Sequence, residues 1–183
     1  MKSHNLSASI QAVITDPAGN VLKSLPPAPA HSLLIQFLQA LYVQCSQSYA
    51  DIRKTNGALE TVGSSAHMFA TNVTSDKDSG IVIGTGETAV TMLDYKLQSQ
   101  AVNNVAYEPH NFVIETPDTS TMRLAISRQF KNNTGATLSI KEVGLYSRLY
   151  DYGQYACMDR TLYAVDVPSG TTITLTYRIT IAL

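Results

Sequence analysis

The chain has 183 residues, of which 44% are hydrophobic and 15% are charged, and this is enough for one domain with a core of ordinary size. Its formal net charge is −1 and its Lys and Arg residues are scattered, which excludes a surface built to neutralise nucleic-acid phosphates. The sequence contains no run of about 18 apolar residues, the length that a membrane span requires, and no signal-peptide pattern follows Met1. We therefore expect synthesis in a cytoplasm and neither a nucleic-acid nor a membrane partner.

The first 50 residues predict a β-hairpin followed by a helix. Apolar residues alternate with polar ones from Leu6 to Ile14, which is typical of a half-buried strand. A turn at 16–20 leads into a second strand at 21–25, and three prolines then form a stiff connector. Ser32 is suited to start a helix that runs to Gln47.

Helical periodicity places Leu34, Leu38, Leu41 and Cys45 on one side of this helix and its glutamines on the other. The pattern indicates an amphipathic helix with an uncharged polar face. Two placements remain open: the helix lies across its own sandwich, or it packs against a neighbouring subunit. Surface binding to a membrane is disfavoured, because that polar face lacks Lys and Arg.

Residues 51–80 are rich in turn signals, with short strands expected around 58–62 and 67–71. From residue 81 onwards the sequence is dominated by β-branched and alternating segments, and tight turns are expected at 132–135 and 168–170. We therefore predict a mainly β fold, an antiparallel jelly-roll-like β-sandwich with an N-terminal hairpin and one amphipathic α-helix. The predicted organisation is a single domain over 1–183, made of a hairpin and helix (1–50), a loop-rich segment (51–80) and a sandwich body (81–183).

The segment Gly84-Thr-Gly-Glu-Thr-Ala89 matches the glycine pattern of a dinucleotide-binding loop and follows a β-branched run. That motif needs a helix directly after it to hold the pyrophosphate, and the residues that follow favour strands. We predict a turn between sandwich strands, with the glycines letting the backbone turn, and no cofactor.

Three further patterns fall short of a chemical site. Asp76, Asp78 and Glu87 resemble a calcium loop, but the glycine is misplaced and flanking helices are missing, so a solvated acidic turn is favoured over a weak divalent-cation site. The four histidines are too far apart for zinc. Glu108 and His110 suggest acid–base chemistry, yet no nucleophile accompanies them, and an exposed loop histidine is the preferred interpretation. We predict no catalytic residue, no metal site and no enzymatic activity.

Cys45 and Cys157 are read as small buried residues, and the sequence neither demands nor excludes a disulfide between them.

The chain has ten tyrosines and no tryptophan, and four of the tyrosines crowd into one predicted hairpin. Tyrosine in loops offers amphipathic area to a protein partner or a sugar ring, although packing inside the sandwich explains the same residues equally well. We predict an interface built from the helix and this hairpin, with the 55–80 loops as adaptable elements; its residues are Leu34, Leu38, Leu41, Tyr146, Tyr150, Tyr152 and Tyr155.

Three segments together resemble small structural proteins of tailed bacteriophages. They are Ile81-Val-Ile-Gly-Thr-Gly-Glu-Thr-Ala-Val-Thr91 with Asp94-Tyr-Lys-Leu97, then 128–146 with its Phe-Lys-Asn-Asn-Thr-Gly and Glu-Val-Gly-Leu-Tyr motifs, then 160–179 with Val-Asp-Val-Pro-Ser-Gly. The resemblance implies a virion protein made in the host bacterial cytoplasm, most simply a capsid decoration or cement protein. Other implied roles are a tail, neck, baseplate or fibre-attachment component, and a carbohydrate-binding module that reads the host surface is the alternative from another class. Implied partners are the major capsid protein or tail proteins and further copies of the chain, with a trimer favoured.

Overall fold

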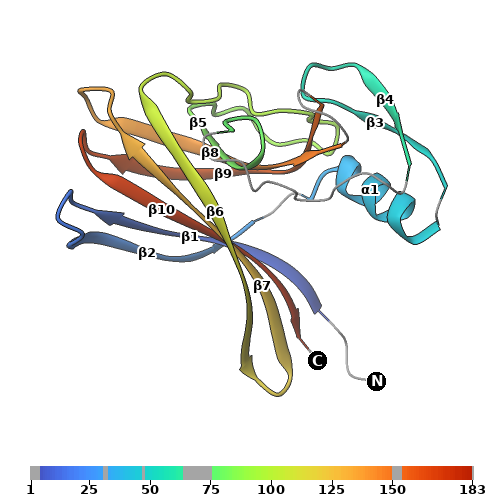
Figure 1. Ribbon diagram of the computed structural model, residues 1–183, viewed down its shortest axis with the longest axis horizontal. Helices are drawn as coiled ribbons and strands as arrows, with labels where there is room; N and C mark the ends of the chain where they lie inside the picture. The colour runs from blue at the N-terminus through green and yellow to red at the C-terminus, as the bar shows by residue number, and fades with distance from the viewer. Residues whose placement is uncertain (1–4, 31–32, 47, 64–75, 150–153, 183) are drawn as a thin grey trace.

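A computed structural model describes residues 5–30, 33–46, 48–63, 76–149 and 154–182 (Figure 1). The fold is mainly β, with 60% strand, one short helix and antiparallel sheets, as predicted. In chain order the elements are β1 (Asn5–Thr15), β2 (Val21–Pro29), α1 (Ile35–Ser46), β3 (Ala50–Arg53), β4 (Leu59–Val62), β5 (Gly80–Gly84), β6 (Val105–Asp118), β7 (Thr121–Asn132), β8 (Leu138–Arg148), β9 (Tyr155–Val167) and β10 (Thr172–Ala182).

The larger sheet has five antiparallel strands in the order β2-β1-β10-β7-β6. Its two central pairings join the N-terminal strand to the C-terminal one and that strand to β7; in register, Ile10 lies opposite Tyr177, which lies opposite Ile126. These three residues are buried, and they belong to the alternating apolar sets of their strands. The period-two pattern read from β1 and β10 therefore marks the face of the sheet that meets the core.

The smaller sheet has three antiparallel strands in the order β5-β8-β9, and it packs on the inner face of the five-stranded sheet. One hydrophobic core joins the two sheets, with Ile81, Ile83, Val143 and Leu145 from the smaller one and Ile173, Leu175, Tyr177 and Phe130 from the larger. Every residue of β5 is buried, because the loop that follows it folds over the far side of this sheet. The two sheets thus form a sandwich-like body.

A second cluster of buried side chains lies under α1. It joins α1 to the β3–β4 hairpin and to β9, and its members are Phe37, Ala40, Ile52, Val62, Leu149, Ala156 and Met158. The helix is shorter than predicted, since it begins at Ile35; the predicted start at Ser32 lies outside the described residues.

Most of the apolar side that helical periodicity defined lies on the surface of the chain. Within α1 the buried residues are Gln36, Phe37, Ala40 and Val43, whereas Leu38, Leu41 and Cys45 are exposed. The second cluster explains this result: α1 is apolar on nearly every side, and the β3–β4 hairpin packs against the stripe that contains its only phenylalanine.

The predicted turns at 16–20, 132–135 and 168–170 are confirmed as connections between paired strands. Gly135 and Gly170 have φ values of 82° and 78°, which a side chain would disfavour. The expected strand at 58–62 corresponds to β4, and the one at 67–71 lies outside the described residues.

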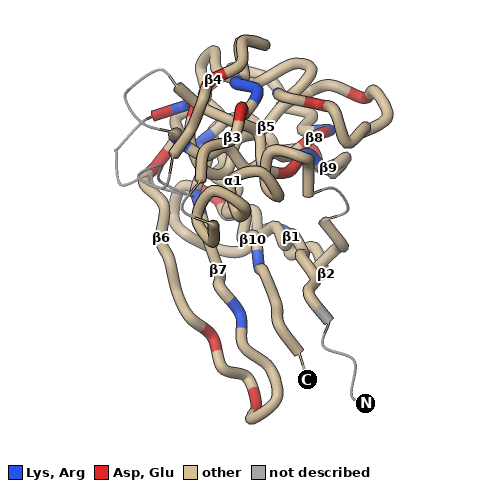
Figure 2. The backbone as a smooth tube through the Cα atoms, turned by 90° about the vertical axis from the view of Figure 1, so that its right-hand side faces the viewer, with Lys and Arg blue, Asp and Glu red and all other residues tan. Residues whose placement is uncertain are grey.

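The five-stranded sheet extends well past the three-stranded one (Figures 1 and 2). We call this extension the overhang and define it as residues 5–9, 110–125 and 178–182. Its longest part is the β6–β7 hairpin, which projects from the body in both views. On the overhang the inner face of the sheet continues beyond the point where the smaller sheet covers it.

Candidate functional site

The loop between β5 and β6 is held over the smaller sheet by one buried carboxylate. Glu142 of β8 has no exposed surface, and its two oxygens accept backbone N–H groups from Gly86 (3.1 Å), Gln98 (3.1 Å) and Ser99 (2.8 Å). The same carboxylate accepts a hydrogen bond of 2.7 Å from Nε of Arg160. A single side chain on a strand thereby fixes both ends of a fifteen-residue excursion from 85 to 99.

Arg160 of β9 completes this network. Besides Glu142 it donates to the Asp94 carboxylate at 2.7 Å and to the backbone oxygen and hydroxyl of Thr88 at 3.0 and 3.1 Å. Burial opposes its charge, but the hydrogen bonds to Glu142 and Asp94 raise the pKa of Arg160. The charged guanidinium therefore connects the loop to the sheet through each of its three nitrogens.

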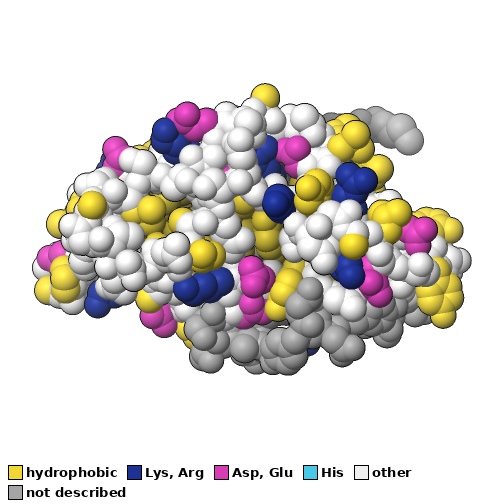
Figure 3. Space-filling view, turned by 90° about the horizontal axis from the view of Figure 1, so that it is seen from above, with side chains coloured by type: hydrophobic (Ala, Val, Ile, Leu, Met, Phe, Trp, Pro, Cys, Tyr) yellow, Lys and Arg dark blue, Asp and Glu magenta, His cyan; other side chains and the backbone are white. Residues whose placement is uncertain are grey.

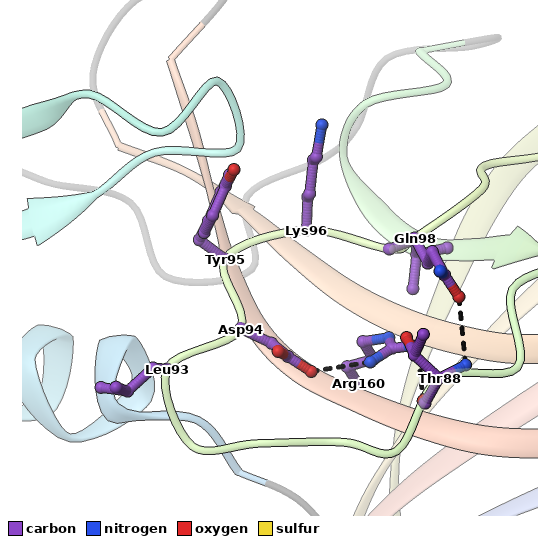
Figure 4. A pocket seen from close by; sticks show the side chains of 8 residues that line it. Thr88, Leu93, Asp94, Tyr95, Lys96, Gln98 and Arg160 are labelled. Carbon is purple, nitrogen blue, oxygen red and sulfur yellow. Dashed lines mark hydrogen bonds and ion pairs between the residues drawn. The ribbon is translucent and has the colours of Figure 1, made fainter.

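The same loop borders a hollow of about 250 Å³, lined by Thr88, Leu93, Asp94, Tyr95, Lys96, Leu97, Gln98 and Arg160. Figure 4 shows Asp94 and Thr88 directed at Arg160, while Tyr95 and Lys96 point away from that group. The charged groups at the base of the hollow are thus satisfied by one another. This arrangement holds the loop against the sheet and commits all three guanidinium nitrogens of Arg160 to contacts within the chain.

Gly84 and Gly86 begin the connection between β5 and β6, and what requires glycine at both positions is close packing. Neither has a positive φ. A Cβ on Gly84 would lie 2.6 Å from a Glu142 oxygen and 2.6 Å from the Ser99 carbonyl, and one on Gly86 would lie 2.5 Å from the same carboxylate. The glycines leave room for Glu142 to reach the loop.

A second buried cation joins the two sheets. Arg128 of β7 is 1% exposed, and its guanidinium donates to four backbone carbonyls: Asp76, Ser79, Glu108 and Ile81. The group lies 4.7 Å from the centre of the Tyr107 ring, a cation–π distance. Burial lowers the pKa of Arg128 to about 10, so it keeps its charge at neutral pH.

His110 lies beside Arg128 in β6 and is not the exposed loop residue that the sequence suggested. Its Nε2 accepts the N–H of Ile81 at 3.0 Å, so the neutral imidazole links the two sheets. Burial, together with the charge of Arg128, lowers the pKa of His110 to about 3. Glu108 contributes its backbone carbonyl to Arg128. The His110 side chain and the Glu108 backbone therefore both take part in the packing between the sheets.

The acidic residues of the suggested cation loop are divided between separate contacts. Asp76 accepts hydrogen bonds from Ser79 and Tyr155, and Glu87 pairs with Lys141. Across the described ranges, no three His, Cys, Asp or Glu side chains gather as metal ligands would. His4, His31 and His67 lie outside those ranges, and Cys45 and Cys157 are both free thiols.

The seven residues of the predicted interface do not form one surface. Leu34, Tyr146 and Tyr155 are buried inside the chain, where Tyr146 accepts the N–H of Leu97 through its hydroxyl at 2.6 Å. Tyr150 and Tyr152 lie outside the described residues. Leu38 and Leu41 lie on the surface of α1.

These two leucines belong to an apolar stripe along α1. Ile35, Leu38, Leu41 and Tyr42 recur at helical spacing and are 37%, 56%, 42% and 55% exposed. We call this set the α1 stripe. Amphipathic helices normally turn such a row of side chains towards the core, so the α1 stripe is a candidate surface for association.

Figure 3 shows basic and acidic side chains interspersed over the face seen from above, without a field of one sign. The described part of the chain contains no helix with the length and apolar character of a membrane span.

The buried charged side chains were not predicted from the sequence, although the strand pattern around one of them indicates that it is buried. Arg128 follows Leu124 and Ile126 and precedes Phe130 in the apolar register of β7, which places it on the core face. Glu142 and Arg160 gave no such signal, because their loop partners are 43 to 72 residues away in sequence.

Comparison of this chain with protein-family models, curated proteins and solved structures finds no match.

Proposed function

We propose that this chain is a non-enzymatic structural protein of a tailed-bacteriophage virion, an accessory decoration or cement protein that acts by burying surface against other subunits. The observation that carries the proposal is the α1 stripe, an apolar helix surface with no cover among the described residues. The resemblance of residues 81–181 to phage structural proteins supplies the virion setting. A jelly-roll-like connection of the two antiparallel sheets belongs to the same proposal.

The polar groups support this role by what they already bind. Arg160, Glu142 and Arg128, which an enzyme could have used for charge stabilisation, are buried and committed to backbone and loop contacts. They make the loop surface rigid, which lowers the entropy lost when it meets a partner. A protein whose mechanism is association benefits from such preorganisation.

A carbohydrate-binding role receives less support. That alternative depended on the tyrosines of the 146–155 hairpin, and two of the four, Tyr146 and Tyr155, are buried. A tail, neck, baseplate or fibre-attachment role would use the same α1 stripe and is separated from decoration by the virion part that is bound.

The proposal is tested by mixing the purified protein with bare phage heads and, separately, with isolated tails, and measuring co-sedimentation. We expect binding to heads, and we expect the double change Leu38→Lys with Leu41→Lys to abolish it, because two ammonium groups would replace buried apolar contacts. Val113→Lys is the matched control, since it also replaces an exposed apolar side chain by lysine, at a position on β6 and not on α1.

Binding to host cells or glycans without binding to heads or tails would contradict the virion role. Binding to tails alone would replace decoration by a tail function. Hydrolysis of a cell-wall polymer that is lost on changing Glu108 or His110 would overturn the non-enzymatic assignment.

A further inference from the structure

The inner face of the overhang carries two rows of apolar side chains. From strand to strand the first row contains Ala8, Ile179, Leu124 and Ile114, and the second contains Leu6, Ile181 and Met122. These rows continue the alternation of core residues such as Ile10, Tyr177 and Ile126. Residues that occupy core positions in the pleat are thus presented outside the core.

Five side chains on this face are strongly exposed: Leu6, Phe112, Ile114, Met122 and Ile181, at between 43% and 61%. Taking about 150–200 Å² for a large apolar side chain, they present roughly 500 Å² of contiguous apolar surface. A stable interface buries about 800 Å² on each partner, so this patch can form most of one side of such an interface.

The opposite face of the same strands is polar and has its charges paired. Arg178 donates to Glu115 at 3.0 Å and to Gln11 at 2.9 Å, and Arg123 lies 3.9 Å from the same carboxylate. Asp118 accepts two hydrogen bonds within its own turn. The overhang therefore has one face suited to water and one suited to a dry contact.

The edges of the sheet restrict how a partner can approach. The edge strand β2 contains Pro26, Pro27 and Pro29, and the edge strand β6 contains Pro109 and Pro117. Proline lacks the N–H that an added strand would need, so extension of the sheet is disfavoured along β2 and at both prolines of β6. Residues 5–8 of β1 lie beyond the pairing with β2, and what distinguishes the overhang there is its apolar face.

We infer that the inner face of the overhang is the surface through which copies of this chain associate. The face carries no charged residue, so two copies bring no like charges together, and the net charge of −1 adds little repulsion. Purely apolar patches are characteristic of interfaces between identical subunits, and two sheet faces pack on each other with side chains interdigitated. A hollow of about 440 Å³ lined by Leu6, Ala8, Pro29, Leu33 and Ile179, with Ser7 and Ala30, borders the base of this face and can receive side chains from the second copy.

This inference rests on the proposed assembly function and names the partner for one of its surfaces. It assigns the overhang to self-association and leaves the α1 stripe to other virion proteins. Each assignment can be disproved without the other. The mass of the isolated protein measures self-association, whereas co-sedimentation with heads measures the virion role.

The experiment is sedimentation velocity of the full chain from about 1 to 100 µM, a range that covers micromolar association. We expect an oligomer for the wild-type chain. Ile114→Lys and Ile181→Lys should each raise the dissociation constant at least about 100-fold, because an unpaired ammonium would be buried.

Val113→Lys is the matched control. Val113 is the neighbour of Ile114, is 44% exposed and points to the polar face, so this change should leave the oligomer intact. Circular dichroism and thermal unfolding establish that each variant is folded. A monomeric wild-type chain at 100 µM would overturn the inference, and so would folded Ile114→Lys and Ile181→Lys variants that both retain the wild-type mass.

Discussion

At the scale of single residues, the notable feature is that the chain buries charged side chains and surrounds them with hydrogen-bond partners. Glu142 and Arg160 are paired with each other, and each also satisfies loop backbone. Arg128 is surrounded by carbonyls and aromatic rings. Such groups stabilise a fold only when every donor and acceptor is matched, so single substitutions here should be costly.

Glu142→Gln should lower the free energy of unfolding by about 2–4 kcal/mol. Each carboxylate oxygen faces N–H donors, Gly86 and Ser99 on one and Gln98 and Arg160 on the other, so either orientation of the amide sets an NH₂ group against two donors. Urea unfolding followed by circular dichroism measures the loss. Glu115→Gln, in a partly exposed ion pair, is the control and should cost less than about 1 kcal/mol.

His110 predicts an acid-sensitive stability. Its pKa is lowered from 6.5 to about 3, mainly by burial, so between these values the unfolded chain binds a proton that the folded chain does not. The free energy of unfolding must then rise with pH across this window. The stability that neutral His110 contributes to the folded chain is fully present above pH 6.5. It is lost as the pH falls towards 3, at up to about 1.4 kcal/mol per pH unit.

His110→Gln provides the comparison, because an amide oxygen can still accept the N–H of Ile81. Urea unfolding at several values between pH 4 and pH 7 should give a shallower dependence for the variant than for the wild-type chain. Identical slopes would show that His110 does not contribute to the acid sensitivity.

At the scale of elements, the 85–99 loop is held against the smaller sheet by hydrogen bonds to Glu142 and Arg160. Gly86→Ala should destabilise the chain by about 1–3 kcal/mol, because the added methyl group overlaps the Glu142 carboxylate and the Gln98 side chain. Limited proteolysis should show earlier cleavage within this loop. Glu87→Ala, at the next position, removes only an exposed ion pair and should leave the cleavage pattern unchanged.

The elements were predictable from the sequence where one physical signal was dominant. Strands β1 and β10 have one buried face, so their alternation gave both the strand and its orientation. The helix was predictable, but its buried side was not. Phe37, Ala40 and Val43 form as apolar a stripe as Leu38 and Leu41 do, and only the position of the β3–β4 hairpin decides between them.

The overhang could not be read from the sequence for a related reason. Alternation shows which residues share a face of a strand, but not how far along the strand another sheet covers that face. Ile114 and Ile126 have the same pattern around them, yet Ile114 is exposed and Ile126 lies in the core. The contact interface predicted at the tyrosines remains untested for Tyr150 and Tyr152, and its buried members serve the core.

At the scale of the whole molecule, the chain presents two separate exposed apolar surfaces, and the proposed assembly role gives each of them a different partner. The α1 stripe and the inner face of the overhang are separate in sequence and belong to different clusters of packing. A chain carrying the double change on α1 should therefore still self-associate, and one carrying Ile114→Lys should still be able to contact heads, though with less avidity. Sedimentation and co-sedimentation of both variants test this independence.

The pairing of β1 with β10 has a consequence for folding. The inner face of the overhang takes Leu6 and Ala8 from β1 and Ile179 and Ile181 from β10. These two strands are far apart in the sequence, and pairings of this kind are slow to form because a long loop must close first. A partly folded chain in which β1 and β10 have not yet paired therefore cannot present this face.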